Sequence, residues 1–148
     1  MDRTAARGIL VKDGKIALMR VGKLDCHKLP GGGAEGQETP EETFVRELME
    51  ETGYRARITH DLGVVDEHKA KTGFCQRSFC FAGEAEAYAG SALTQNERDL
   101  GYGLEWMAAS EALALFEDDA QTFEEYTIRF MFAREAAIVR EWIRVCGG

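Results

Sequence analysis

Two apolar runs near the start of the chain predict a pair of strands. Gly8–Val11 and Ile16–Met19 are rich in aliphatic residues, and Asp13-Gly14 between them is a strong signal for a two-residue turn. We therefore expect a hairpin from Ala5 to Val21. The segment that follows, Gly22 to Gly36, is rich in glycine and is expected to be a loop.

The next segment carries start and stop signals for a helix. Thr39 is suited to cap the N-terminus, Pro40 suits the first helical position, and Glu42 completes a capping box with Thr39. Gly53 is the expected stop, because glycine readily adopts the left-handed conformation at a helix end. The pattern predicts a helix from about Pro40 to Thr52.

Strand signals return after this helix. Segments from about Arg55 to Val65 and from Gly73 to Tyr88 carry strand signals, and Phe74–Phe81 is aromatic-rich with alternating polarity. Gly90 to Gly103 is polar and is expected to be a loop. Leu104–Met107 is interpreted as a short strand.

Two helices are expected in the last third of the chain. Ser110 is expected to cap a short helix from Glu111 to Phe116, and Thr122 with Glu125 forms a second capping-box pattern that opens a terminal helix reaching about Arg144. The apolar positions of the terminal helix are interpreted as core residues rather than as a surface that stacks bases: Phe123, Tyr126, Phe130, Ala133, Ala137 and Trp142.

Strands with a few helices between them predict an α+β fold with α/β/α layers. We expect a mixed sheet flanked by the helix at Pro40–Thr52 and by the long C-terminal helix. The length of 148 residues suits a single domain that covers residues 1–148.

Composition narrows the range of partners. The formal net charge of −8 argues against a surface for duplex nucleic acid, although small phosphorylated substrates remain compatible with it. The four cysteines include no Cys-x-x-Cys pair and are interpreted as reduced thiols of a cytoplasmic protein. No apolar run has the length of a signal peptide or a membrane span, so no membrane contact is expected.

Three carboxylates of the first predicted helix share one edge. Glu47, Glu50 and Glu51 stand at positions i, i+3 and i+4, which places them within an arc of about 100°. Like charges at these spacings repel. Either solvent and the neighbouring Arg46 relieve the repulsion, or a hard divalent cation such as Mg²⁺ or Mn²⁺ does. The helix spacing alone does not separate these alternatives.

A glycine run, Leu29-Pro30-Gly31-Gly32-Gly33, precedes this helix and allows the backbone to approach a ligand closely. Gly31, Gly33 and Gly36 also match the spacing of a dinucleotide-binding fingerprint. That interpretation is rejected, because Pro30 precedes the glycines and the helix starts only near Pro40, whereas the fingerprint follows a strand directly and opens a helix.

The stretch from Gly32 to Tyr54 resembles the Nudix box, G-x5-E-x7-R-E-U-x-E-E-x-G-U, at every fixed position, with Leu48 and Tyr54 as the bulky apolar residues. Nudix enzymes hydrolyse nucleoside diphosphates linked to another group. The resemblance therefore implies metal-dependent hydrolysis of a phosphoanhydride bond with Mg²⁺ or Mn²⁺ as cofactor.

The resemblance also implies roles for single residues. Glu50 and Glu51 correspond to metal ligands, Glu47 to a further ligand or to the general base, and Gly31 to a carbonyl ligand of the metal. Arg46 corresponds to the arginine that holds a carboxylate of the catalytic motif in place. The structural positions of the motif are Gly32, Glu38 and Gly53.

Four residues outside the box are weaker candidates. Glu97 is a candidate for a further metal ligand, and Arg7, Glu67 and Arg77 are candidates for substrate binding. For each of them a solvated strand or loop position is the alternative interpretation.

The chain carries no secondary motif of a Nudix subfamily; its two prolines, Pro30 and Pro40, both precede the end of the box. A nucleoside triphosphate, including an oxidised one, is the favoured substrate, with ADP-ribose or a nucleotide sugar as the alternative. A nucleotide-sensing domain without catalysis is the alternative from another class, and the intact box disfavours it, as it does an isoprenyl diphosphate isomerase. A homodimer is a further expectation.

Overall fold

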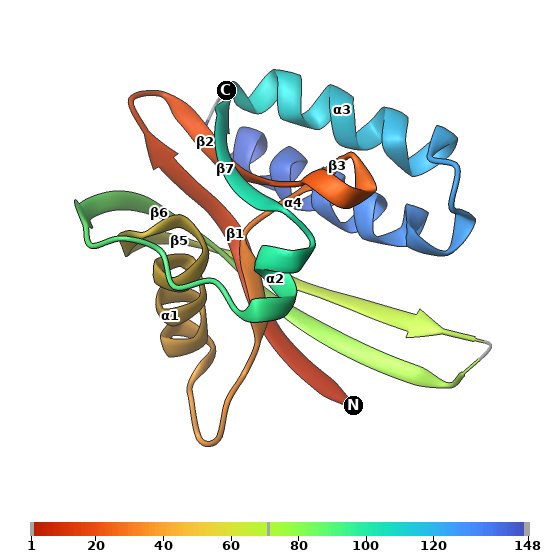
Figure 1. Ribbon diagram of the computed structural model, residues 1–148, viewed down its shortest axis with the longest axis horizontal. Helices are drawn as coiled ribbons and strands as arrows, with labels where there is room; N and C mark the ends of the chain where they lie inside the picture. The colour runs from red at the N-terminus through yellow and green to blue at the C-terminus, as the bar shows by residue number, and fades with distance from the viewer. Residues whose placement is uncertain (1, 71, 147–148) are drawn as a thin grey trace.

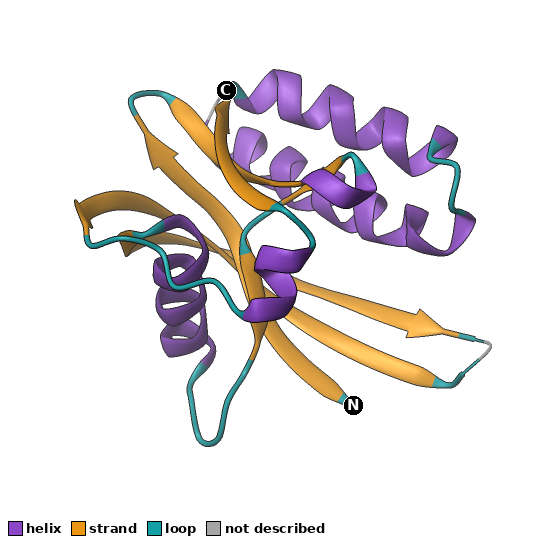
Figure 2. Ribbon diagram, in the orientation of Figure 1, coloured by secondary structure: helices purple, strands orange, loops and turns teal. Residues whose placement is uncertain are grey.

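The computed structural model describes residues 2–70 and 72–146, and its strands form one mixed sheet (Figure 2). The main path runs in the order β3-β2-β1-β6-β5, while β4 pairs with β1 and β7 with β2. The strands are β1 (Arg3–Lys12), β2 (Lys15–Val21), β3 (Cys26–Lys28), β4 (Gly31–Gly33), β5 (Tyr54–Lys69), β6 (Phe74–Tyr88) and β7 (Tyr102–Met107).

Strand β1 makes the sheet mixed, because it pairs antiparallel with β2 and parallel with β6. The predicted hairpin is β1–β2. Its turn residues Asp13 and Gly14 both have positive φ, 52° and 76°, as the primed two-residue turns require. The expected α+β fold with a mixed sheet is confirmed.

Helices cover both faces of the sheet (Figure 1). Helix α1 (Pro40–Thr52) packs on one face, where Phe44 and Leu48 join a buried cluster with Leu10 and Phe81. Helices α3 (Ala109–Thr122) and α4 (Arg129–Cys146) lie on the other face.

The core under α3 and α4 is built from side chains of these helices and side chains of the sheet. Phe116 of α3 and Phe132 of α4 belong to one buried cluster with Ile9 and Leu18 of the sheet. Since Ile9 and Leu10 are consecutive, β1 sends alternate side chains into the two cores. This burial on both faces explains its continuous apolar run.

Helix α1 has the predicted bounds. Thr39 Oγ1 accepts the N–H of Glu42 at 3.2 Å, and the Glu42 carboxylate accepts the N–H of Thr39 at 2.9 Å. Gly53 ends the helix with φ of 82° and donates its N–H to the Met49 carbonyl. The capping box and the glycine stop are both confirmed.

The predicted start of the terminal helix is wrong. Thr122 is the last residue of α3, and its hydroxyl donates back to the Asp118 carbonyl at 2.8 Å instead of capping a new helix. The chain is extended at Phe123, with ψ of 135°, and passes through the 3₁₀ turn η2 (Tyr126–Ile128) before α4 begins at Arg129.

This shift moves the buried face of α4. Tyr126 is 65% exposed, Phe130 is 62% exposed and Ala133 is exposed, so none of the three is a core residue as expected. The buried apolar positions of α4 are Phe132, Ala136, Ile138 and Val139. Helix α3 is longer than predicted and contains Ser110 in its first turn rather than as its cap.

Two segments expected to be loops contain short elements. Gly22–Gly36 holds the 3₁₀ turn η1 (Gly22–Leu24) together with β3 and β4, and Gly90–Gly103 holds α2 (Gln95–Asp99) and the start of β7. Among residues 2–70 and 72–146, no helix has the length and apolar character needed to cross a membrane.

Candidate active site

Arg46 of α1 joins the helix to the loop before it. Its Nε donates to Glu38 at 2.6 Å, its Nη2 to the Gly33 carbonyl at 2.9 Å, and its Nη1 to Glu47 at 3.0 Å. The bond from Arg46 lowers the pKa of Glu38 to about 2. The guanidinium thus fixes β4 and the loop against the acidic edge of the helix.

Glu51 is the most deeply buried carboxylate of α1, with 3% exposure. Its Oε1 accepts the N–H of Gly31 at 2.8 Å, and its Oε2 lies 3.5 Å from Lys28 Nζ. Burial raises the pKa of Glu51 to about 7, although Lys28 and the Gly31 amide act in the opposite direction. Burial therefore favours the neutral form of Glu51, and a positive charge beside it favours the charged form.

Glu47 lies one turn earlier and faces the glycine strand. A Cβ atom on Gly32 would stand 2.6 Å from the carboxyl carbon of Glu47, so only glycine lets the carboxylate occupy this place. Burial raises the pKa of Glu47, and the bond from Arg46 opposes that shift.

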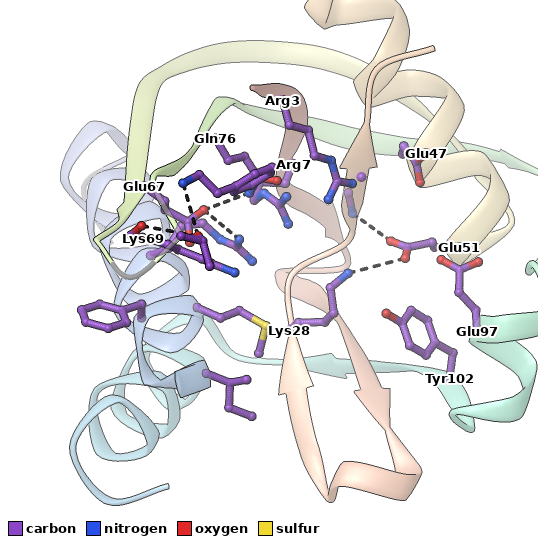
Figure 3. Close-up of a pocket in the computed structure, with 18 residues that line it drawn as sticks. Arg3, Arg7, Lys28, Glu47, Glu51, Glu67, Lys69, Gln76, Glu97 and Tyr102 are labelled. Carbon is purple, nitrogen blue, oxygen red and sulfur yellow. Dashed lines mark hydrogen bonds and ion pairs between the residues drawn. The ribbon is translucent and has the colours of Figure 1, made fainter. Parts of the chain in front are cut away.

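Glu47 and Glu51 line a cavity of about 800 Å³ (Figure 3). Figure 3 shows three groups along it. Glu47, Glu51, Glu97 and Tyr102 lie at one end; Glu67, Lys69 and Gln76 lie at the other; Arg3, Arg7 and Lys28 lie between them. Cationic side chains therefore separate the two ends.

The end that holds Glu67 is also the more apolar one. Phe74, Ile128, Phe130 and Met131 line the cavity. The Lys69 ammonium lies 5.9 Å from the centroid of the Phe74 ring, and Phe130 precedes by one helical turn Arg134, which binds Glu67 at 3.1 Å. We call this part, Phe74, Ile128, Phe130 and Met131, the apolar end.

Three of the four candidates outside the box line the cavity: Arg7, Glu67 and Glu97. Arg7 is buried and donates to Ser78 Oγ at 3.0 Å. Burial, with Arg134 as the next cause, lowers the pKa of Arg7 to about 10. Glu97 accepts the N–H of Thr94 at 2.9 Å in the capping box of α2.

Two other candidates lie away from the cavity lining. The two oxygens of Glu50 lie 3.3 Å from Arg46 Nη1, and Glu50 is not among the residues that line the cavity. Arg77 is directed to the opposite side of β6 from Gln76 and forms two bonds to Asp66, at 2.8 and 2.9 Å. The structure therefore does not bring Arg77 to the substrate candidates Arg7 and Glu67.

Sequence reasoning missed several residues of the cavity. Lys28 directly precedes the glycine run in the sequence, and this proximity could have identified it as a residue of the site. Phe130 was assigned to the core because the helix start was misplaced. Arg134 follows from neither motif nor spacing, since only the packing of α4 on the sheet brings it to Glu67.

The side chains at the acidic end fit a hard divalent cation in their chemistry. Glu47, Glu51 and Glu97 offer only oxygen atoms, as Mg²⁺ and Mn²⁺ prefer. Within the described part of the chain, no three His, Cys, Asp or Glu side chains stand close enough to hold an ion together. Lys28 lies beside Glu51 and Arg46 beside Glu47, so these two carboxylates are partly neutralised.

Curated proteins that resemble the chain over part of its length carry the names of nucleotide pyrophosphatases and diphosphatases. The chain is 44% identical over 63 residues to an ADP-ribose pyrophosphatase of Methanocaldococcus jannaschii, covering 40% of this chain and 37% of that protein. It is 36% identical over 61 residues to a putative 8-oxo-dGTP diphosphatase of Bacillus subtilis, covering 41% of each. The chain spans between 30% and 42% of the length of the curated relatives it matches.

Solved structures share the fold over more of the chain. A NUDIX hydrolase from Nitrosomonas europaea superposes with a TM-score of 0.66 at 18% identity, covering 90% of this chain and 89% of that one. A MutT NUDIX hydrolase from Burkholderia pseudomallei gives 0.59 at 25% identity, covering 73% and 84%. The sequence pattern of the NUDIX domain matches residues 2–129. With that match spanning most of its length, and with Gly32, Glu47 and Glu51 of the box lining one cavity, the chain belongs to the Nudix family.

Proposed function

We propose that the protein hydrolyses a phosphoanhydride bond in a nucleoside diphosphate linked to another group. The observation that carries the proposal is the pair Glu47 and Glu51. Both have raised pKa values, both face the cavity, and Arg46 and the glycine strand hold them in place.

Glu51, Glu97 and the Gly31 carbonyl are the groups that would hold a divalent cation. When bound, Mg²⁺ or Mn²⁺ neutralises phosphate oxygens and lowers the pKa of water. Glu47 is positioned by Arg46 and takes the proton of the attacking water as general base.

The cations between the two ends of the cavity bind the phosphate chain. Lys28 and Arg7 are both anchored, Lys28 beside Glu51 and Arg7 on Ser78, so they present fixed positive charge to phosphate oxygens. Arg3 lines the same wall. This charge lets an acidic chain accept an anionic substrate.

The nucleoside occupies the apolar end. The volume of about 800 Å³ lies within the range of cavities that hold a nucleotide-sized ligand. Phe130 is a large exposed aromatic residue at this end and offers its ring to a base. We favour a nucleoside triphosphate, including an oxidised one; ADP-ribose is the second candidate, on the name of the M. jannaschii relative.

The test is a substrate panel with Mg²⁺: nucleoside triphosphates, oxidised triphosphates, ADP-ribose, dinucleoside polyphosphates and nucleotide sugars. Glu51→Gln and Glu47→Gln are expected to lower kcat by about a hundredfold or more, because each removes a charge that the reaction needs. The matched control is Glu41→Gln, an exposed acid of the same helix. Full turnover in both variants contradicts the proposed chemistry, and tight binding without turnover by the native protein indicates a nucleotide sensor.

The nucleoside assignment has its own variant. Phe130→Ala is expected to raise KM about tenfold, because stacking on an aromatic ring stabilises a bound base by roughly 1–3 kcal/mol. Its melting temperature is expected to stay unchanged, since the side chain is largely exposed. Val145→Ala, an exposed residue in the last turn of the same helix, is the control. An unchanged KM places the base elsewhere.

A further inference from the structure

Helix α4 carries two adjacent charged residues inside the protein. Arg134 is 7% exposed and Glu135 is 0% exposed, among buried neighbours that are otherwise apolar, such as Phe132 and Ile138. Burying an ion pair costs solvation free energy, and a well-packed apolar pair is often as stable or more stable. Stability alone is therefore a weak explanation for these two charges.

The two side chains belong to a continuous line of hydrogen bonds. Glu135 Oε2 accepts the N–H of Leu29 at 2.7 Å, and its Oε1 accepts from Arg134 Nε at 2.8 Å. Arg134 Nη1 then donates to Glu67 Oε1 at 3.1 Å, and Gln76 Nε2 donates to the same oxygen at 3.0 Å. The line begins at Leu29 and ends at Glu67 and Gln76. Glu67 and Gln76 lie at the end of the cavity opposite Glu51 (Figure 3).

Leu29 connects the buried Glu135 to the backbone that holds Glu51. It lies between β3 and β4, it is completely buried, and its N–H is directed at Glu135. Two residues later, the N–H of Gly31 holds Oε1 of Glu51 at 2.8 Å. Only Pro30 separates the residue that Glu135 fixes from the residue that fixes Glu51.

We infer that Glu135 is a positioning residue for the hydrolysis proposed above, on which this inference rests. Its carboxylate sets the place of Leu29 and therefore the place of the Gly31 amide against Glu51. Through Arg134 it also sets the place of Glu67. One buried carboxylate on the C-terminal helix is thus linked by hydrogen bonds to both ends of the cavity.

The variants Glu135→Met and Arg134→Met with Glu135→Met separate positioning from stability. The single variant leaves Arg134 without its nearest partner and is expected to melt at a lower temperature. The double variant replaces the pair with apolar side chains and is expected to recover most of that loss. Both lack the acceptor for Leu29, so kcat is expected to stay about ten- to a hundredfold below the native value in both.

A purely stabilising role predicts that kcat recovers together with the melting temperature in the double variant, and that result overturns the inference. In Glu135→Met, kcat is expected to fall by a larger factor than KM rises, because Glu135 does not line the cavity and acts on Glu51 through the Leu29–Gly31 backbone. Arg140→Met is the matched control: Arg140 lies on the same helix, is exposed, and pairs with Glu117 of α3. Its kcat is expected to equal that of the native protein.

Amide hydrogen exchange tests the inference without any substrate. In the native protein the Leu29 amide is expected to exchange as slowly as that of Leu18 in the core of β2. In the double variant the Leu29 and Gly31 amides are expected to exchange at least tenfold faster, while Leu18 is unchanged. Fast exchange at Leu29 in the native protein, or slow exchange in the variant, overturns the inference. If the native protein hydrolyses no nucleotide, the proposed function fails. The exchange rates then still show whether Glu135 fixes the Leu29 and Gly31 amides.

Discussion

At Gly32 the lack of a side chain determines where a carboxylate lies. The space that a Cβ would fill is occupied by the carboxyl group of Glu47, whereas Cβ atoms on Gly31 would meet the backbone and Cβ of Arg7. The two neighbouring glycines therefore serve different purposes. Gly31 lets two strands approach each other, and Gly32 admits the end of a flexible side chain.

We predict that Gly32→Ala folds normally but loses activity. The added methyl displaces only the tip of Glu47, so the free energy of unfolding is expected to change by less than about 1 kcal/mol. A displacement of a reacting group by about 1 Å is expected to lower kcat tenfold or more. Urea unfolding and steady-state kinetics check the two parts. Gly103→Ala is the control, since its Cβ would meet no atom within 4 Å; equal kcat in both variants contradicts the assigned place of Glu47.

At the scale of elements, the prediction succeeded where the signal is local and failed where it is not. Helix α1 is delimited by its own capping box and its own glycine, so its bounds follow from adjacent residues. The same pattern at Thr122–Glu125 opens no helix, because the chain is extended at Phe123, whose ring packs 5.0 Å from that of Phe132. That tertiary contact overrides a local preference and has no counterpart in the sequence pattern.

This contrast yields a paired prediction. Thr39→Ala removes a real cap and is expected to lower the free energy of unfolding by about 1 kcal/mol. Thr122→Ala removes bonds to the carbonyl and the carboxylate of Asp118 at an exposed helix end, and a change within about 0.5 kcal/mol is expected. Urea titrations of both variants measure the difference. A larger loss at Thr122 would show that the terminal helix starts where the sequence pattern places it.

The residues of the candidate site likewise fall into those that local sequence predicts and those that it does not. The box residues are contiguous, so the arc of Glu47 and Glu51 and the clamp of Arg46 follow from helix spacing. Arg7 and Arg77 are both strand arginines, but only the register and facing of their strands direct Arg7 into the cavity and Arg77 out of it. Register is a property of the assembled sheet, so the sequence gives no means to choose between them.

At the scale of the whole molecule, the buried carboxylate of Glu51 makes folding depend on pH. Burial raises its pKa to about 7 from an ordinary value of 4.5, so the native state binds this proton more tightly than the unfolded chain does. The stabilisation from this group is complete below the unfolded pKa near 4.5 and is lost as the pH rises through about 7.

We therefore predict that the advantage of Glu51→Gln grows with pH. Relative to the native protein, its free energy of unfolding is expected to rise between pH 5 and pH 8 by up to about 1.4 kcal/mol per unit of pKa shift. Urea unfolding in EDTA, which keeps cations away from the site, measures this difference. Glu41→Gln is the control, because that acid is exposed. A difference that is independent of pH would mean that Glu51 ionises like an exposed acid.

The long hairpin of β5 and β6 projects beyond the rest of the sheet (Figure 1) and supplies cavity residues from its end: Lys69, Thr72 and Phe74. Glu47 and Glu51 come from α1, on the opposite side of the cavity and earlier in the chain. Because the two contributions are encoded separately, mutation and selection can act on one while the other is inherited unchanged. Proteins that share this architecture can therefore change the substrate they accept through substitutions at the hairpin tip, while the carboxylates of α1 stay unchanged.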